Sequence, residues 1–306
     1  MRYLLLLIPL LFLSLMIGCS RMSSPTVESG VSLELAQYRK ATISDITYSL
    51  YFNIPEGLSQ SITATETITF VLQDAGSEVQ LDFRESGDLL KSLRVNGTKT
   101  KIQHKKEHLI IPPEPLKQGK NTIELSFTAG ETSLNRNPDY LFTLFVPDRA
   151  RTAFPLFDQP DLKAVYHLTL EISQKWDAIS NAPIESQEES DSTKTLQFAS
   201  SEHISSYLFS FVAGDFKRIT QTVDGLEMSM LHRETDQEKV ERNRDDIFHL
   251  HKASLDWMEQ YTGIEYPFRK FDFALIPSFP YGGMEHTGAI QYRASSLFLD
   301  PDPSDS

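Results

Sequence analysis

The feature that most limits the fold is a two-residue alternation of apolar and polar side chains. Over 46–54 every second residue is apolar, and the same period returns over 62–72 and 79–83. Because successive side chains of a strand point to opposite faces, this alternation predicts strands with one buried face. Five further strands are expected at 108–111, 121–127, 164–172, 195–199 and 207–213. So many short strands favour a mainly β fold, an antiparallel β-sandwich or saddle-shaped double sheet.

Two polar segments predict the turns of hairpins in this β region. Asn96-Gly97 is a strong two-residue hairpin signal, because both residues tolerate a positive φ. The acidic, serine-rich stretch Glu185–Ser192 predicts a solvated hairpin loop.

Further along the chain the apolar period becomes that of a helix. Thr235 and Glu238 have the spacing of a capping box, and Gly263 provides a C-terminal stop. We therefore expect a helix over 236–261, the first in the chain, and a domain boundary near residue 220. The residues expected on its buried face are Ile247, Leu250, Ser254, Trp257, Met258 and Tyr261. The strands expected after it are 271–276 and one that leaves Gly282-Gly283.

The N-terminus carries an export signal. Arg2 precedes an apolar run, Leu4–Ile17, which is shorter than the ~20 residues of a spanning helix. The run ends in Met16-Ile17-Gly18-Cys19, which resembles the lipobox of bacterial lipoproteins. This resemblance implies a signal peptide over 1–18 and acyl chains on Cys19, which give a stable membrane anchor. The alternative is an ordinary signal peptide or membrane anchor with an incidental cysteine.

The residues after the cysteine indicate how the folded domain is linked to the lipid and in which membrane the protein is anchored. The small, polar segment 19–35 suits a tether between lipid and folded domain. Ser20 stands where an acidic residue would favour the inner membrane, so the resemblance implies the outer membrane, facing the periplasm. The formal net charge of −13, with no basic stripe to offset it, argues against nucleic acid as a partner. Because Cys19 is the only cysteine, no disulfide forms within the chain and no cysteine nucleophile is available.

Several histidines raise the question of a metal site. His104-Lys-Lys-Glu-His108 matches the inverted zinc-peptidase motif H-x-x-E-H, which requires both histidines on one helical face. The segment lies between two strand-like stretches, so a polar hairpin tip accounts for it. His249 and His251 are two positions apart on the predicted helix, on different faces, and are expected to be exposed or packed. Asn96-Gly-Thr98 matches a glycosylation acceptor, but the hairpin turn explains the same residues.

The segment Tyr281-Gly-Gly-Met-Glu-His286 combines two glycines with a carboxylate. Glycines let a ligand backbone approach closely, and on a strand edge they allow pairing with an extended peptide. Glu285 would then hold a cationic terminus. From spacing alone, a glycine turn before an ordinary strand with an exposed glutamate is the favoured interpretation.

Three segments in order, Arg151–Pro160, Ser205–Asp215 and Phe279–His286, resemble motifs of one known family. Phe279-Pro-Tyr-Gly-Gly-Met-Glu-His286 is similar to the Gly-x-Met-Glu-Asn signature of the membrane alanyl aminopeptidase (aminopeptidase N) family of zinc peptidases. Arg151-Thr-Ala-Phe-Pro-Leu-Phe-Asp-Gln-Pro160 and Ser205-Ser-Tyr-Leu-Phe-Ser-Phe-Val-Ala-Gly-Asp215 resemble two segments of its first domain. The resemblance implies a saddle-like β domain over 36–220 and the start of a thermolysin-like α+β catalytic domain over 221–306.

The resemblance also assigns roles to individual residues. Glu285 would bind the free α-amine of a peptide, and a buried carboxylate there would reject peptides that lack one. The backbone of Gly282, Gly283 and Met284 would bond the peptide. His286 replaces the usual asparagine, with a charge expected to change near neutral pH.

A second carboxylate or amide of the family also contacts the amine. The position that matches it here is Val146, with Asp148 nearby as a substitute.

No H-E-x-x-H occurs in the sequence. We expect the N-terminal part of a zinc aminopeptidase that binds peptides with a free N-terminus but holds no zinc and performs no catalysis. An exposed apolar patch is then expected on the helix 236–261 and the strand 284–293. The rival hypothesis is a non-catalytic envelope lipoprotein whose β domain binds peptides or other partners. The reading frame beyond Ser306 separates the two.

Overall fold

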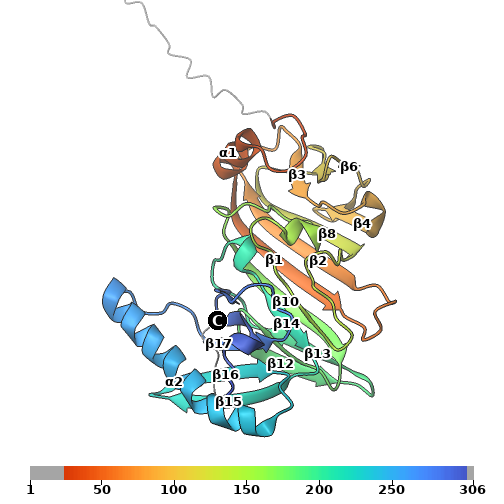
Figure 1. The fold of residues 1–306 in the computed structure, drawn as a ribbon. Helices are drawn as coiled ribbons and strands as arrows, with labels where there is room; N and C mark the ends of the chain where they lie inside the picture. The colour runs from red at the N-terminus through yellow and green to blue at the C-terminus, as the bar shows by residue number, and fades with distance from the viewer. Residues whose placement is uncertain (1–23, 302–306) are drawn as a thin grey trace, which may run out of the picture.

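The computed structural model describes residues 24–301. Figure 1 shows α1 and a small sheet containing β3 and β6 at one end, and α2 with β15 to β17 toward the other. The predicted signal peptide and Cys19 lie outside the described residues. No helix within 24–301 is long and apolar enough to span a membrane.

The largest sheet has eight strands in the order β12-β13-β10-β1-β2-β8-β4-β5. Their bounds, in chain order, are β1 Ile43–Asn53, β2 Thr63–Leu72, β4 Leu90–Val95, β5 Thr98–Lys99, β8 Gly119–Thr128, β10 Ala164–Ser173, β12 Ile184–Glu189 and β13 Thr193–Phe198. The prediction of a mainly β fold is confirmed. One pair departs from the antiparallel pattern, because β1 and β10 run parallel. A parallel pair requires a long crossover, and here residues 54–163 supply it.

Two three-stranded sheets complete the β region. One has the order β3-β7-β6, with β3 Val79–Asp82, β6 His104–Lys105 and β7 His108–Ile111. The other has the order β11-β14-β9, with β9 Tyr140–Phe142, β11 Asp177–Ser180 and β14 Phe211–Gly214. The strand expected over 207–213 is therefore shorter, because Ser206–Leu208 form a 3₁₀ turn before β14.

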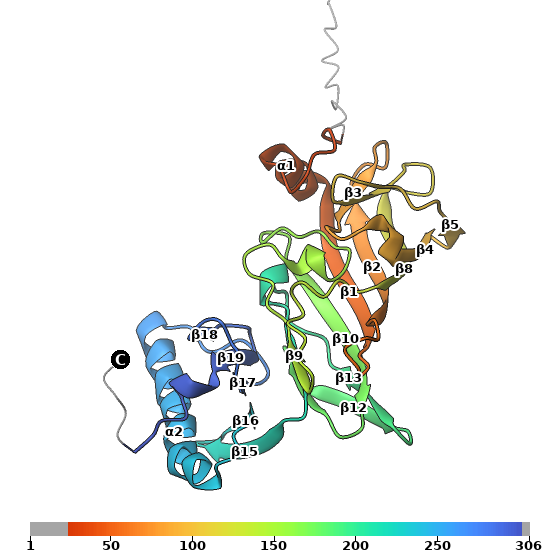
Figure 2. The same cartoon turned by 45° about the vertical axis from the view of Figure 1, so that its right-hand side comes forward.

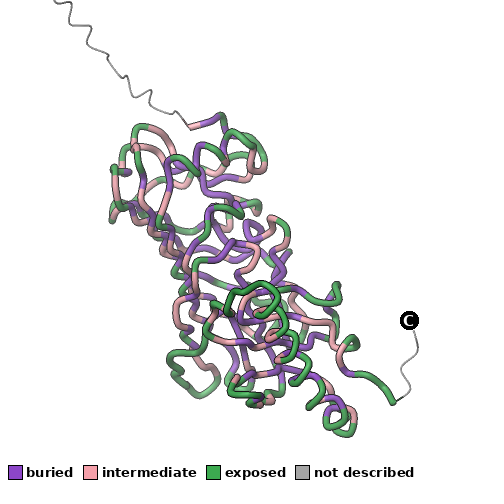
Figure 3. Tube along the Cα trace, turned by 90° about the vertical axis from the view of Figure 1, so that its left-hand side faces the viewer, coloured by how far each residue is buried: buried purple, intermediate pink, exposed green. Residues whose placement is uncertain are grey.

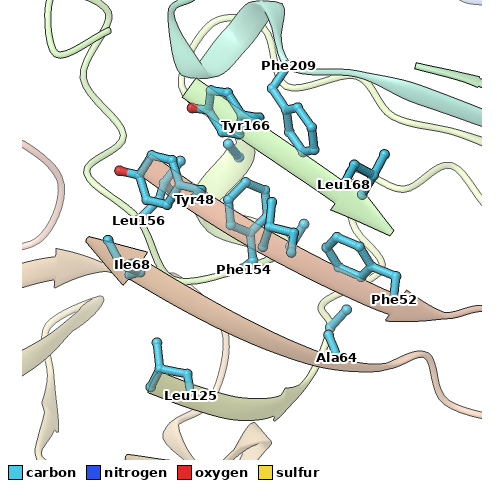
Figure 4. Packing of buried hydrophobic residues seen from close by; sticks show 14 of the residues in the cluster. Tyr48, Phe52, Ala64, Ile68, Leu125, Phe154, Leu156, Tyr166, Leu168 and Phe209 are labelled. Atoms are coloured by element: carbon cyan, nitrogen blue, oxygen red, sulfur yellow. The ribbon is translucent and has the colours of Figure 1, made fainter. Parts of the chain in front are cut away.

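An aromatic core lies behind the large sheet. Tyr166 stacks on Phe209 with ring centroids 4.4 Å apart, and Phe154 meets Tyr48 and Phe52 edge-on (Figure 4). Tyr48 and Phe52 occupy apolar positions of the alternation over 46–54, so the pattern placed the buried face of β1 correctly. Such aromatic pairs add about 0.5–1.5 kcal/mol each beyond the area they bury.

Glu66 is the exception on this face. It lies between Leu50 and Leu125 in register, is buried, and neither carboxyl oxygen has a hydrogen-bond partner among the described residues. Burial raises the pKa of Glu66 well above its usual value, because the charged carboxylate would be removed from water.

Both predicted turns form. Asn96 and Gly97 have positive φ angles and connect β4 to β5. The Glu185–Ser192 segment is a hairpin, but its loop is shorter than expected, because β12 continues as a fully exposed strand to Glu189.

The C-terminal part is a five-stranded sheet packed against one long helix. The strand order is β15-β16-β17-β19-β18, and α2 spans Gln237–Thr262. The strand bounds are β15 Lys217–Val223, β16 Leu226–His232, β17 Asp272–Ile276, β18 Gly283–Met284 and β19 Ala289–Arg293.

The helix expected over 236–261 is confirmed, with two corrections. Its N-cap is Asp236, whose carboxylate accepts from the Lys239 N–H at 3.1 Å, so the proposed Thr235 capping box is wrong. The carboxylate of Glu234 instead accepts from the N–H of Thr235 and of Asp236. Gly263 ends the helix in the left-handed conformation, as expected.

The second correction concerns the buried face of α2. The buried residues are Val240, Asn243, Ile247, Phe248 and His251. Most of the face predicted to be buried is exposed, since the large apolar side chains exposed on the helix are Leu250, Trp257, Met258 and Tyr261. In Figure 3 this helix faces the viewer and is mostly coloured as exposed. The apolar patch expected on the helix is thus confirmed, whereas on the strand 284–293 it is wrong, because Met284, Ala289 and Gln291 are buried.

A short helix near the N-terminus was missed. α1 spans Leu33–Thr42 and begins at the N-cap Ser32, so the long helix α2 is not the first. Only Leu35 and Tyr38 provide buried apolar side chains, too few to produce a helical period in the sequence.

Residues before α1 are docked on the β domain. The carbonyl oxygen of Pro25 accepts from the Gln80 side chain at 2.8 Å, and Val27 is buried. This docked stretch belongs to the segment 19–35 that was predicted as a tether.

A buried charge network anchors α1. The Arg39 guanidinium bonds both carboxylate oxygens of Asp82, at 2.6 and 2.8 Å, and His108 Nδ1 lies 2.8 Å from the same carboxylate. Burial alone would raise the pKa of Asp82, but Arg39 and His108 outweigh this and hold it at about 2.

The same network explains the His104–His108 motif. The segment is a hairpin, as predicted, with Lys105 opposite His108. His108 Nε2 donates to the carbonyl oxygens of Glu28 at 2.7 Å and Gly30 at 3.0 Å, so this histidine holds the docked N-terminal segment.

Candidate functional site

The Gly-Gly-Met-Glu-His segment forms an edge of the five-stranded sheet. Strand β18 pairs with β19 alone, Gly283 opposite Tyr292 and Met284 opposite Gln291. Figure 2 shows β18 and β19 on the side of the C-terminal unit that carries α2. The outer side of β18 has no strand partner among residues 24–301, so its backbone is open to pairing with an extended chain.

The two glycines serve different purposes. A Cβ on Gly283 would lie 2.8 Å from the Tyr292 ring, so glycine is required there by the neighbouring strand. A Cβ on Gly282 would meet nothing within 4 Å, and this residue is exposed. The open space at Gly282 is therefore available to a ligand rather than filled by the protein.

Strand β18 is fixed by an apolar cluster that we call the inter-sheet core. Met284 is buried in it, and the Phe142 and Phe279 rings meet there at 5.5 Å. Its full membership is Tyr140, Phe142, Leu144, Ile179, Val212, Phe216, Leu231, Ala274, Ile276, Phe279, Met284 and Ala289. These residues come from both the β11-β14-β9 sheet and the five-stranded sheet, so the site edge is positioned by the β domain.

Glu285 is exposed, which corrects the expectation of a buried carboxylate. Its neighbours Met284 and His286 are buried, so the alternation turns the Glu285 side chain outward. Its carboxylate makes no hydrogen bond or ion pair within the described part of the chain. It is thus available to a cation from outside.

His286 is completely buried, and neither ring nitrogen has a partner among the described residues. Burial lowers the pKa of His286 to about 3, because the charged imidazolium would have no water around it. The expected charge change near neutral pH is therefore wrong, and the ring is neutral there.

Buried polar residues that sequence reasoning missed hold this segment in place. The Asn181 amide donates to the carbonyl oxygen of Thr287 at 2.9 Å and accepts from the Ser210 N–H at 2.8 Å. Gln291 donates to the Ser210 hydroxyl at 3.0 Å. The only sequence signal is that Asn181 and Ser210 are polar residues beside apolar strands, which does not distinguish a buried amide from an exposed loop.

Neither Val146 nor Asp148 provides the expected second contact to the peptide amine. Val146 packs against the inter-sheet core, and the Asp148 carboxylate is paired with the Arg151 guanidinium. Asp148 is thus neutralised within the chain and offers no free charge to a ligand.

The described residues, 24–301, contain no group of three or more histidine, cysteine or acidic side chains placed to bind one metal ion. This part of the chain therefore provides no set of ligands for a zinc ion.

A sheet edge with open glycine backbone can pair with an extended chain, and the unpaired carboxylate beside it can accept a cation. Comparison with known families identifies the class of protein. The Peptidase M1 N-terminal domain matches residues 42–208, and the Peptidase family M1 domain matches residues 247–306. The chain belongs to peptidase family M1, a family of metallopeptidases, which confirms the resemblance inferred from its motifs.

Individual relatives are aminopeptidases. The chain is 35% identical over 162 residues to the puromycin-sensitive aminopeptidase of Caenorhabditis elegans, which covers 52% of the chain and 17% of that protein. It is 33% identical over 162 residues to the glutamyl aminopeptidase of Bos taurus, covering 52% of the chain and 16% of the relative. It is 26% identical over 257 residues to aminopeptidase N of Streptomyces lividans, and this match covers 79% of the chain and 29% of the relative. The chain thus spans between 16% and 29% of the length of these relatives.

Proposed function

We propose that this chain forms the N-terminal part of a zinc-dependent aminopeptidase that removes N-terminal residues from peptides. The observation that carries the proposal is the open edge of β18 next to the unpaired, exposed carboxylate of Glu285. Membership of the M1 family and its aminopeptidase relatives support the reaction class.

The chain's own part in that reaction is to hold the substrate. An extended peptide would pair with the outer side of β18, where Gly282 leaves room for its backbone. The ammonium group of the peptide would then donate to the Glu285 carboxylate. Since an exposed ion pair is worth about 0–1 kcal/mol, binding by this chain alone is weak.

Zinc belongs to the proposed whole enzyme, in which it would activate the attacking water. The described residues offer no zinc ligands, so no step through the metal is assigned to them.

Replacing Glu285 tests the amine anchor. Because the ion pair is exposed, Glu285→Gln is expected to weaken binding of a free-amine tetra-alanine amide by up to about fivefold. Its N-acetylated form should bind equally to both variants, as measured by NMR chemical-shift titration. Glu265→Gln, at another exposed carboxylate, is the matched control. An equal loss for the acetylated peptide would show that Glu285 acts on structure and not on the amine.

We also propose that Cys19 is acylated and that the protein is anchored in a bacterial envelope, facing the periplasm from the outer membrane. The support is the sequence alone, an apolar run that ends in Gly18-Cys19. Mass spectrometry of the mature N-terminal peptide is expected to find acyl chains on Cys19. Replacement by Cys19→Ser should abolish both the acylation and extraction with the membrane fraction.

A further inference from the structure

Four lysines are concentrated on one short segment of the β domain. Lys99 lies in β5, Lys101 follows it, and Lys105 and Lys106 lie at the turn from β6 to β7. All four are exposed. In a protein with a net charge of −13, this segment stands out as a local positive surface, which we call the lysine end.

The docked N-terminal segment reaches the domain at this same end. The Gly30 N–H donates to the Glu107 carboxylate at 3.1 Å, and His108 holds the carbonyl oxygen of Glu28. Glu107 and His108 directly follow Lys105 and Lys106 in the β6–β7 hairpin. Farther back, the Gln80 side chain bonds Ser24 and Pro25, so the first described residues are already fixed to the β3-β7-β6 sheet.

The covalent distance from this docked point to Cys19 is short. Cys19 precedes Ser24 by five residues, and each residue spans at most about 3.6 Å, so the two are separated by at most about 18 Å. A lipid on Cys19 would therefore hold the headgroup layer close to the β3-β7-β6 sheet. The β12–β13 hairpin and β15 lie toward the opposite end of the molecule in Figure 1.

We propose that the lysine end lies against the anionic phospholipid surface of the membrane, with the C-terminal unit that carries the candidate site at the end far from it. This orientation rests on the proposed acylation of Cys19. The acyl chains supply most of the affinity, and the lysines select which face meets the headgroups. A lysine near an anionic surface contributes about 1 kcal/mol, and this falls off over a Debye length of about 8 Å. The rest of the acidic surface is repelled by the same headgroups.

This orientation would leave the candidate site accessible to soluble peptides. Strand β18 and Glu285 belong to the C-terminal unit, which lies at the far end from α1 and β3 in Figures 1 and 2. Soluble peptides would thus reach the edge of β18 without crossing the headgroup layer.

Depth-dependent fluorescence quenching tests the orientation in the lipid-modified full chain. Because Cys19 is the only cysteine and would be occupied by lipid, a label can be placed on Gln103→Cys at the lysine end or on Glu188→Cys in β12. Both positions are exposed. In phosphatidylglycerol vesicles with a headgroup quencher, the Gln103→Cys label is expected to be quenched roughly threefold or more beyond the Glu188→Cys label.

Charge variants identify the cause. Replacing Lys101, Lys105 and Lys106 by glutamine in the Gln103→Cys protein is expected to bring the two positions close to equal quenching. Replacing Lys175, Lys194 and Lys217 by glutamine changes the charge equally and should leave the difference intact. Phosphatidylcholine vesicles should also reduce the difference.

Two failures are distinguishable. An acylated chain with equal quenching at both positions overturns the orientation alone, and a quenching difference that does not respond to the lysine replacements overturns the lysines as its cause. A chain shown by mass spectrometry to carry no acyl group overturns the anchor and, with it, the orientation that rests on it.

Discussion

Arg39→Ala is expected to destabilise the protein by about 3–5 kcal/mol, the largest effect of any single substitution discussed for the β domain. Arg39 and Asp82 are both buried, so removing the guanidinium leaves a buried carboxylate with only His108 and the Asp158 N–H beside it. The free energy of unfolding from urea titration measures the loss. The N-terminal segment should also become protease-sensitive, because Arg39 on α1 holds that segment to the β3-β7-β6 sheet.

The neighbouring residue provides the control. Lys40 pairs with Asp161 at 3.7 Å, and both side chains are 58% exposed. Lys40→Ala is therefore expected to cost less than about 1 kcal/mol. Equal effects of the two substitutions would contradict the assignment of the buried pair as the anchor of α1.

His286→Asn is expected to make the free energy of unfolding less dependent on pH below pH 6.5. In the unfolded chain His286 takes up a proton near its ordinary pKa of 6.5, whereas in the folded protein its pKa is about 3. Below pH 6.5 the unfolded state thus binds more protons, and stability is lost as the pH falls toward 3. At about 1.4 kcal/mol per pKa unit, the loss amounts to about 4 kcal/mol across this range.

The slope of unfolding free energy against pH separates this effect from any change in packing caused by asparagine. The slope between pH 6.5 and 4 should decrease in His286→Asn, and His249→Asn, at an exposed histidine of α2, is the matched control. An unchanged slope in His286→Asn would mean that the imidazole is protonated in the folded protein.

Local patterns predicted most of the strands and the position of α2. The alternation over 46–54 fixes which face of β1 is buried, and it does so because a one-residue slip would expose every apolar side chain. Even Glu66, which breaks the pattern, remains on the buried face, since its neighbours in β2 determine where its side chain points. Gly263 likewise marks a helix end through its own backbone preference.

Features that depend on partners far along the chain escaped prediction. The helix α1 is stabilised by the pair of Arg39 and Asp82, which are 43 residues apart. A pair so distant in sequence leaves no periodic pattern of apolar residues from which it could be predicted. The buried face of α2 was misjudged because the apolar side chains of Trp257 and Tyr261 have the right spacing, but no strand within 24–301 covers them. At the candidate site, the motif identified Gly283 and Glu285, but only the fold shows that Glu285 is exposed.

The inter-sheet core has a consequence for anyone who builds chimeras from M1 enzymes. A junction near residue 220 separates the β domain from the C-terminal unit in the sequence. In the structure it divides the inter-sheet core, to which Phe142 contributes from one side and Phe279 from the other. A transplanted C-terminal unit would bring its own Phe279 and Met284 equivalents against a foreign Tyr140–Leu144 segment. To keep the matched surfaces in one parent, the Tyr140–Leu144 segment and the core residues Ile179, Val212 and Phe216 must be exchanged together with the C-terminal unit.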